Sequence, residues 1–358
     1  MITITNAAAI CNLGDNLDEI FQNLTAGKLT DFKVTSPLPE ITSEKYNIRC
    51  NRMLLHCLNQ IKPDISRLIE KYGKKKIGVV IATTNTGIDK FEITNDYELL
   101  KMSNPAEFLK EYLGLEGLFC GVSTACSSGI KAFSIAQKWI ESGLCDAVIA
   151  GGADELSKFP LAGFKSLEVL SDKRSNPFSK NVTGINISEA AALFVLEKEN
   201  KGIKVLGLGE TSDAYHISTP NPDGEEAAKA MLNALKEANL NPSDIDYINL
   251  HGTGTLANDT MEANAVSKIF DGKTPVSATK PLTGHCLGAA ASIETAICYE
   301  LLSNNKNILP PHIYDGEYNP NIPKLNLVGK NTEVNEVKNV MCNAFGFGGT
   351  NAVIILGK

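Results

Sequence analysis

One cysteine and two histidines are the residues best suited to chemistry in this chain, and each lies in a run of small residues. Cys126 lies within Gly-Val-Ser-Thr-Ala-Cys-Ser-Ser-Gly (121–129), directly before an amphipathic helical pattern at 127–140. A thiol at a helix start faces unpaired N–H groups and the positive end of the helix dipole, which favour the nucleophilic thiolate. Taken alone, Cys126 is more simply explained as a small buried residue under a turn.

The two histidine runs change that balance. His251 opens His-Gly-Thr-Gly-Thr (251–255) after an apolar stretch, and His285 closes Lys-Pro-Leu-Thr-Gly-His (280–285) before an Ala-rich helical pattern. The chain has five histidines in all. Two of them beside Gly/Thr loops, with a cysteine at a helix start, form a plausible set of nucleophile and hydrogen-bond donors. The glycines of Phe-Gly-Phe-Gly-Gly-Thr-Asn (345–351) allow close approach of the backbone to a ligand.

These four runs, in this order and at about these spacings, resemble the elongating β-ketoacyl-acyl carrier protein synthases. The resemblance extends from about residue 77 to the C-terminus. It implies a decarboxylative Claisen condensation, in which Cys126 receives an acyl group from carrier-protein phosphopantetheine. Malonyl-carrier protein then loses carbon dioxide, and its carbanion attacks the thioester to give a 3-oxoacyl product. The resemblance implies no cofactor bound by the protein itself, since the phosphopantetheine belongs to the carrier.

The resemblance also assigns catalytic roles. The backbone N–H groups of Cys126 and Phe347 match the donors that stabilise the thioester oxyanion. Neutral His251 and His285 would each donate one N–H to the enolate formed by decarboxylation. Lys280 matches the lysine of the family motif, where its charge would keep His285 neutral by like-charge repulsion.

Further residues are expected around this set. Lys280 is also expected to form an ion pair with Glu294. On the substrate side, the resemblance implies that Thr253 and Thr255 bind the pantetheine arm, and that Phe347 closes the acyl pocket. Two other neighbours complete the substrate-binding prediction, namely Phe345, for which packing is the simpler role, and Gly348. Helix capping accounts for the two acidic residues Asp259 and Glu262. No metal site is predicted.

Composition narrows the class of protein. The 358 residues carry a net charge of −7, which argues against non-specific nucleic-acid binding. Nine cysteines are scattered without Cys-x-x-Cys pairs, which argues against disulfides and zinc and favours a reducing cytoplasm. No stretch approaches a membrane span of about 20 apolar residues, and no secretory leader precedes the first strand-like run at 2–10.

Apolar strand-like runs alternate with helical patterns, which predicts an α/β protein with buried sheets covered by helices. Predicted strands are 77–82, 147–150, 192–196, 203–206, 245–250, 340–343 and 353–356, and predicted helices are 52–72, 127–140, 225–239, 260–269 and 288–302. Similar strand-and-loop endings at 190–196 and 351–356 suggest a duplicated unit. The resemblance implies the thiolase-like fold, with two related halves in a five-layer α-β-α-β-α arrangement. We therefore predict halves at 1–200, carrying the nucleophile, and 201–358, carrying the histidines.

Two partners are expected. An acidic acyl carrier protein would need a local basic cluster, for which Lys74–Lys76, Lys165 and Arg174 are candidates. The family pairs its sheets across a two-fold axis, so a dimer is expected, either with an identical chain or with a related synthase-like subunit. The apolar segment 118–122 is the candidate edge strand.

Alternatives remain at this stage. A non-catalytic partner that only sets chain length would keep the fold and lose the cysteine, so Cys126 argues against it. A thiolase would need a second catalytic cysteine near the C-terminus, for which Cys342 is the only candidate. Segments 72–80, 86–88, 176–180 and 184–187 look like the compact synthases of aryl-polyene pigment pathways, which suggests a conjugated substrate rather than saturated fatty acid alone.

Overall fold

The structure is a computed structural model that describes residues 2–304 and 306–358. Its strands are β1 (Ile2–Cys11), β2 (Ile77–Ala82), β3 (Phe119–Val122), β4 (Ala147–Asp154), β5 (Ala190–Glu197), β6 (Ile203–Ser212), β7 (Tyr247–Asn249), β8 (Pro275–Ser277), β9 (Asn326–Leu327), β10 (Asn339–Gly346) and β11 (Thr350–Gly357). Its α-helices are α1 (Leu17–Thr25), α2 (Arg49–Gln60), α3 (Lys62–Tyr72), α4 (Ile88–Thr94), α5 (Asn104–Tyr112), α6 (Ser128–Glu141), α7 (Lys158–Ser166), α8 (Glu225–Ala238), α9 (Leu256–Ile269), α10 (Lys280–Thr283) and α11 (Ala290–Ser303). Short 3-10 turns are η1 (Lys74–Lys76), η2 (Tyr97–Leu100), η3 (Pro242–Asp244) and η4 (Leu287–Ala289).

The strands form one sheet whose order repeats itself. The order is β3-β2-β4-β5-β1-β6-β11-β10-β7-β8-β9, so β3-β2-β4-β5-β1 in the first half is mirrored by β8-β7-β10-β11-β6 in the second. The pairing directions repeat as well, because β2 is parallel to β3 and β4 as β7 is to β8 and β10. The duplication expected from the two strand endings, now β5 and β11, is therefore confirmed.

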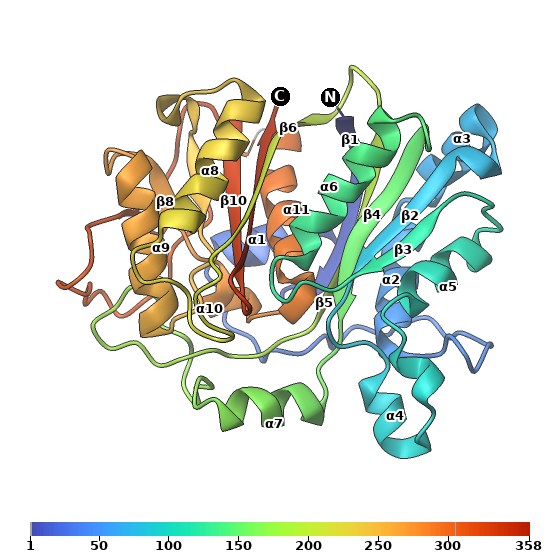
Figure 1. Ribbon diagram of the computed structural model, residues 1–358, viewed down its shortest axis with the longest axis horizontal. Coiled ribbons are helices and arrows are strands. Elements are labelled where there is room, and N and C mark those ends of the chain that lie inside the picture. The colour runs from blue at the N-terminus through green and yellow to red at the C-terminus, as the bar shows by residue number, and fades with distance from the viewer. Residues whose placement is uncertain (1, 305) are drawn as a thin grey trace.

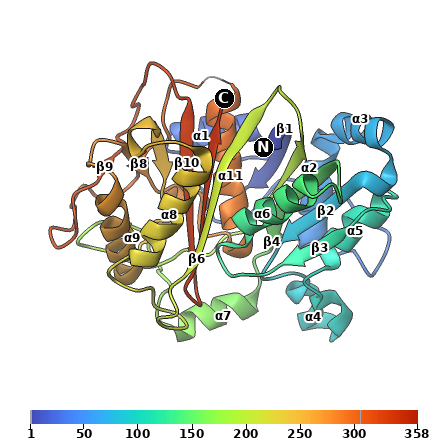
Figure 2. The same ribbon diagram turned by 45° about the horizontal axis from the view of Figure 1, so that its top comes forward.

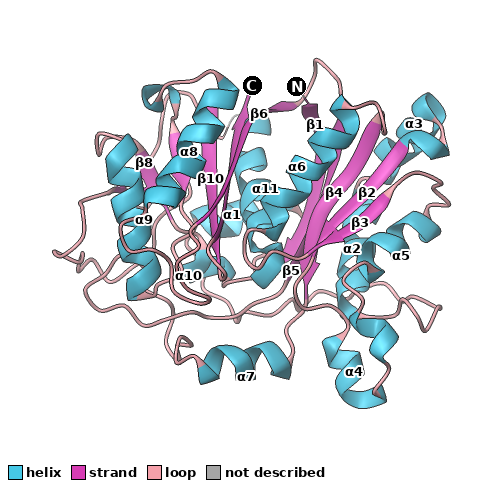
Figure 3. Ribbon diagram, in the orientation of Figure 1, coloured by secondary structure: helices cyan, strands magenta, loops and turns pink. Residues whose placement is uncertain are grey.

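The arrangement in layers follows from where the apolar side chains are buried. Helices α6 and α11 lie between the two halves of the sheet, and their apolar residues share one core with β1, β5, β10 and β11 (Figures 1 and 3). Helices α2, α3 and α5 cover the outer face of the first half, and α8 and α9 cover that of the second (Figure 2). This is the expected thiolase-like, five-layer arrangement.

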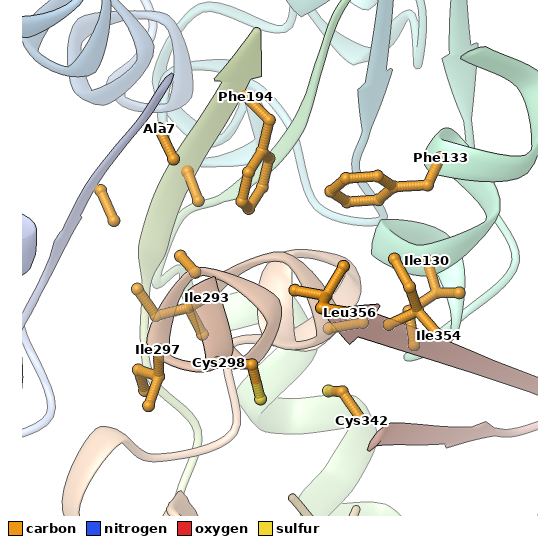
Figure 4. Packing of buried hydrophobic residues seen from close by; sticks show 14 of the residues in the cluster. Ala7, Ile130, Phe133, Phe194, Ile293, Ile297, Cys298, Cys342, Ile354 and Leu356 are labelled. Atoms are coloured by element: carbon orange, nitrogen blue, oxygen red, sulfur yellow. The ribbon is translucent and has the colours of Figure 1, made fainter. Parts of the chain in front are cut away.

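The central core is tightly built around its two helices. Phe133 of α6 packs edge-on against Phe194 of β5, with ring centroids 4.8 Å apart. Ile293 and Ile297 of α11 lie beneath them in Figure 4. The first turns of the two helices meet between the halves, since a Cβ atom on Gly129 of α6 would lie 2.5 Å from the Ser292 nitrogen of α11.

Several element boundaries differ from the predictions. The single helix predicted at 52–72 is two helices, α2 and α3, because Pro63 stands in the first turn of α3 and cannot continue a helix. The helix predicted at 260–269 begins at Leu256, capped by Thr255. The segment 198–202 links β5 to β6, and the boundary predicted at residue 200 falls in this link; the division into two domains stays a prediction.

Two features bear on partners and location. Strand β3, which includes most of the predicted edge segment 118–122, is the outermost strand at its end of the sheet. In the described part of the chain, no helix combines the length and apolar character that crossing a membrane requires.

Candidate active site

Cys126 lies in a sharp turn between β3 and α6. Ala125 adopts a left-handed conformation with φ of 52°, which small side chains tolerate best. The Ser128 hydroxyl stabilises the turn by accepting from the Thr124 N–H at 2.7 Å and donating to the Ala125 carbonyl at 2.6 Å. Helix α6 begins at Ser128, so Cys126 stands just before its first turn.

Three reactive side chains meet from both halves of the fold. The sulfur of Cys126 and one ring nitrogen each of His251 and His285 lie within 4.8 Å of one another. His251 follows β7, and His285 lies in the turn before α11. The two rings stand nearly perpendicular, with centroids 5.6 Å apart, and all three residues are buried. The proximity is observed, whereas the catalytic roles remain predictions.

Lys280 is part of the same cluster and its three N–H donors are all used. Its ammonium lies 2.6 Å from the His251 carbonyl oxygen, 3.3 Å from His251 Nδ1 and 2.5 Å from Glu294 Oε1. The predicted ion pair with Glu294 is therefore present. Burial raises the pKa of Glu294 to about 7, and the neighbouring Lys280 opposes that rise.

The hydrogen bonds fix which nitrogen of each histidine carries the proton. The Leu287 N–H donates to His285 Nδ1 at 3.0 Å. Lys280 has only donors, so His251 Nδ1 must accept from it. In a neutral imidazole with an accepting Nδ1, the proton is on Nε2. Both rings therefore present an Nε2–H donor, and neither offers a free Nε2 lone pair for a metal.

Both histidines are held neutral. Burial, and then the charge of Lys280, lowers the pKa of His285 to about 3. Burial also lowers the pKa of His251 well below its usual range, with contributions from Lys280 and His285. The expected repulsion from Lys280 is present, but desolvation is the larger cause.

The expectation that the helix start makes Cys126 a thiolate is wrong in this structure. Burial raises the pKa of Cys126 to about 11, although Lys280 and the N–H groups of Phe347 and Cys126 itself lower it. The helix start does act in the expected direction, but removing the thiolate from water outweighs it. Burial therefore favours the thiol form of Cys126.

Asp259 and Glu262 do more than cap a helix, which corrects the sequence-based view. Both are fully buried. Glu262 accepts hydrogen bonds from the backbone N–H groups of His251 and Gly252, each at 2.7 Å, and from the Asn343 side chain. Asp259 accepts from the N–H groups of Gly254 and Phe178. Together they fix the loop that carries His251.

Two cavities meet at Cys126. The first is lined by His251, His285, Thr253, Thr255, Asn258, Phe345, Phe347 and Gly348. The two threonine hydroxyls lie 3.1 Å apart on its wall. The second shares Cys126 and Phe347 with the first and is lined mainly by apolar residues, including Ile88, Phe159, Phe164, Leu167 and Leu287.

Aromatic rings separate these cavities. Phe164 of α7 stacks on Phe347 with ring centroids 5.6 Å apart and lies 6.4 Å from the His285 ring. Phe164 is not among the residues predicted from the sequence, because an apolar residue in a short helix looks like a packing residue. Phe345 packs edge-on against His251 at 6.0 Å, as well as lining the first cavity.

Other candidates from the sequence lie elsewhere or are already engaged. Cys342 lies in β10 beside Cys298 of α11 (Figure 4) and, unlike Cys126, lines neither cavity, so it is not placed to act as a second catalytic thiol. Arg174 donates to the carbonyls of Pro281 and Thr30 and stacks on a ring, so it is a structural residue.

The remaining candidates for binding a carrier protein lie at different distances from the site. Lys74–Lys76 precede β2, whereas the site lies beyond the other end of that strand, roughly 20 Å away at about 3.3 Å per residue. This position argues against docking at the site entrance. Lys165 is exposed on α7, whose neighbouring residues line both cavities, and it remains a candidate.

Comparison with known proteins agrees with this site. Residues 52–202 match the family Beta-ketoacyl synthase, N-terminal domain, and residues 203–314 match Beta-ketoacyl synthase, C-terminal domain. The 3-oxoacyl-[acyl-carrier-protein] synthase 2 of Coxiella burnetii is 30% identical over 413 aligned residues, which cover 100% of this chain and 98% of that protein.

Solved structures extend the similarity to the whole fold. A chain of the complex of the ketosynthase ApeO with its chain length factor ApeC from Xenorhabdus doucetiae superposes with a TM-score of 0.94 and 38% identity, covering 99% of this chain and 97% of that one. The ishigamide ketosynthase/chain length factor shares the fold, with a TM-score of 0.90 at 24% identity, 100% coverage of this chain and 98% of that one. The chain therefore belongs to the β-ketoacyl synthase family and is a condensing acyltransferase of fatty acid or polyketide biosynthesis.

Proposed function

We propose that this chain is the catalytic subunit of a ketosynthase that extends a conjugated, polyene-type acyl chain on an acyl carrier protein. The observation that supports catalysis is the convergence of the Cys126 thiol with the rings of His251 and His285, whose Nδ1 atoms are occupied as acceptors and whose protons are therefore on Nε2. A non-catalytic chain-length subunit has no need of this arrangement.

The first step is acyl transfer to Cys126. Its sulfur attacks the carrier thioester carbonyl, and the N–H groups of Cys126 and Phe347 stabilise the oxyanion. Because Cys126 is protonated at rest and both histidine Nε2 atoms already carry protons, the thiol proton leaves with the departing pantetheine sulfur. The products are the Cys126 thioester and the free carrier thiol.

The second step is decarboxylation and condensation. The bond between the malonyl α-carbon and its carboxylate breaks, carbon dioxide leaves, and the enolate oxygen accepts from His251 and His285. Each such donor is worth roughly 3 kcal/mol. The α-carbon then attacks the thioester, expelling the Cys126 thiolate, which takes one proton from solvent. Thr253 and Thr255 would orient the pantetheine arm along the first cavity.

Two observations support the polyene substrate and a synthase-like partner. The second cavity is walled by Phe159, Phe164 and Phe347, which suit a flat conjugated chain. The similar solved structure is a complex of a ketosynthase with its chain length factor. Strand β3, at one end of the sheet, bears the partly exposed Phe119, so this edge is the proposed pairing surface. The nine free cysteines favour a cytoplasmic location.

The substrate is tested by mass spectrometry of carrier-bound products. The enzyme, expressed alone and together with a synthase-like partner chain, is offered polyenoyl- and saturated acyl-carrier proteins of equal length. We expect faster elongation of the polyenoyl chain, and activity that depends on co-expression. A clear preference for the saturated chain would reject the polyene assignment, and full activity of a homodimer would reject the heterodimer.

A further inference from the structure

Asp154 is a buried carboxylate near the site that the mechanism above does not use. It is the last residue of β4 and is fully buried. Six donors surround its two oxygens, namely the N–H groups of Thr84, Asn85, Gly288 and Ala289 and the hydroxyls of Thr83 and Thr84. Four of these are backbone N–H groups, which cannot accept a proton in return, so the network suits an ionised carboxylate.

These donors belong to two separate parts of the chain. Thr84 and Asn85 follow β2 in the first half, whereas Gly288 and Ala289 form the helix start that leads into α11 in the second. The carboxylate therefore ties the halves together at the positive end of α11, where a negative charge is favoured. Leu287, next in the chain to Gly288, is the residue whose N–H donates to His285.

The duplicated fold shows what occupies the same place in the other half. Asp154 ends an eight-residue strand, β4, as Gly346 ends the eight-residue strand β10, in the same register against the next strand. Leu287 has φ of 53° three residues before α11, as Ala125 has φ of 52° three residues before α6. Gly288 is thus the counterpart of Cys126.

Neither helix start has room for an added Cβ atom on the neighbouring glycine. A Cβ atom on Gly346 would lie 3.1 Å from the Cys126 nitrogen, and one on Gly288 would lie 2.8 Å from Asp154 Oδ2. In the first half, glycine leaves the helix start open beside the sulfur. In the second half, the side chain of Asp154 fills the corresponding space.

We propose that Asp154 is a positioning residue for His285. Its carboxylate occupies the place in the second half that corresponds to the oxyanion site of the first half. It thereby holds the turn at 287–289, which presents His285 to the substrate. This inference rests on the proposed role of His285 in decarboxylation. With the turn held, the Leu287 N–H stays on His285 Nδ1 and the proton stays on Nε2. Without the carboxylate, the N–H groups of Gly288 and Ala289 keep only their second acceptors, the Thr84 hydroxyl at 3.1 Å and the Cys286 carbonyl at 3.0 Å, and the turn can shift.

The test is chemical rescue. Asp154→Gly should release carbon dioxide from malonyl-carrier protein about 10²-fold more slowly, the loss that a displacement of about 1 Å can cause, while acyl loading of Cys126 changes less than tenfold. Formate should occupy the vacated space and raise the rate of carbon dioxide release by this variant at least tenfold. Neutral formamide should not raise it. Asp154→Asn should lose the rate without being rescued.

The matched control is Glu197→Gln. Glu197 is also a buried carboxylate, but it lies at the far end of β5 and pairs with Arg67 and Lys71. It should destabilise the protein without changing the ratio of decarboxylation to loading. A folded Asp154→Gly enzyme with wild-type decarboxylation would overturn the proposal, as would equal rescue by formate and formamide.

A measurement on the wild-type protein covers the case in which neither Asp154 variant folds. Nitrogen-15 NMR of labelled histidine should show His285 protonated on Nε2 at neutral pH, and an Nδ1–H signal there would overturn the inference. If Cys126 accepts no acyl group in the wild type, the proposed function fails instead, and the NMR result still stands as a separate test of the positioning role.

Discussion

The helix starts of α6 and α11 are two versions of one structure. Both follow a left-handed residue, at Ala125 and Leu287, and both point backbone N–H groups to the junction of the halves. The first carries a thiol and an adjacent glycine, whereas the second carries a glycine and an adjacent carboxylate. The two helix starts are therefore similar anion-binding ends, of which the first is open to the proposed reaction intermediate and the second is filled by the Asp154 carboxylate.

The difference shows how few residues separate a reactive site from a structural one. The strand order, the register and the strained turn are common to both halves. The two helix starts differ in two residues. The first has Cys126 at the turn and Gly346 at the strand end, whereas the second has Gly288 and Asp154. Predictions that exchange or remove these features test the comparison directly.

The largest effect is expected from Cys126→Ala, because it removes the group that distinguishes the two helix starts. Acylation on incubation with acyl-carrier protein and condensation should both disappear, as measured by intact mass and by product formation. Cys120→Ala is the matched control, since this partly exposed cysteine lies six residues earlier and should leave the adduct in place. A persistent adduct on another cysteine with normal turnover would disprove the assignment.

Gly346→Asp should make the first helix start resemble the second. A carboxylate beside the Cys126 N–H would compete with the thioester oxyanion, so acyl loading should fall about 10²–10³-fold, as on loss of an oxyanion donor. Gly346→Ala separates crowding from charge and should be milder, because its Cβ meets the Cys126 nitrogen at 3.1 Å. Equal losses in both variants would show that space, rather than charge, keeps this site open.

His285→Ala should separate the two chemical steps. Carbon dioxide release should fall about 10²–10³-fold through loss of one enolate donor, while loading of Cys126 stays within a few-fold of wild type. Single-turnover loading and radiolabelled carbon dioxide release measure the two steps. An equal loss of both would mean that His285 acts as a general base for Cys126.

The smallest effect is a pH dependence. Since burial raises the pKa of Cys126 to about 11, the thiolate fraction is small at neutral pH and grows with rising pH. Alkylation by iodoacetamide should accelerate about tenfold per pH unit from 7 upward, followed by mass spectrometry within the range where the fold persists. A plateau by pH 8 would show that the helix start overcomes burial after all.

Much of the site was predictable because its residues lie in short runs of unusual composition. Cys126, His251, Lys280 and His285 were all identified, and so was the ion pair of Lys280 with Glu294. Phe164 was missed because nothing in its local sequence distinguishes a wall residue from a packing residue. Asp154 was missed for a similar reason, since an acidic residue at a strand end resembles an ordinary loop residue.

The sequence by itself determined the nucleophile turn, the glycine-rich loops and the alternation of strands and helices, because these depend on local sterics and on periodic burial. Only the tertiary structure decided the protonation of the site. The pKa of Cys126 depends on how much water the surrounding chain excludes, and the histidine tautomers depend on donors contributed by Leu287 and Lys280. Desolvation and long-range hydrogen bonds arise only when distant segments meet, so no local pattern records them.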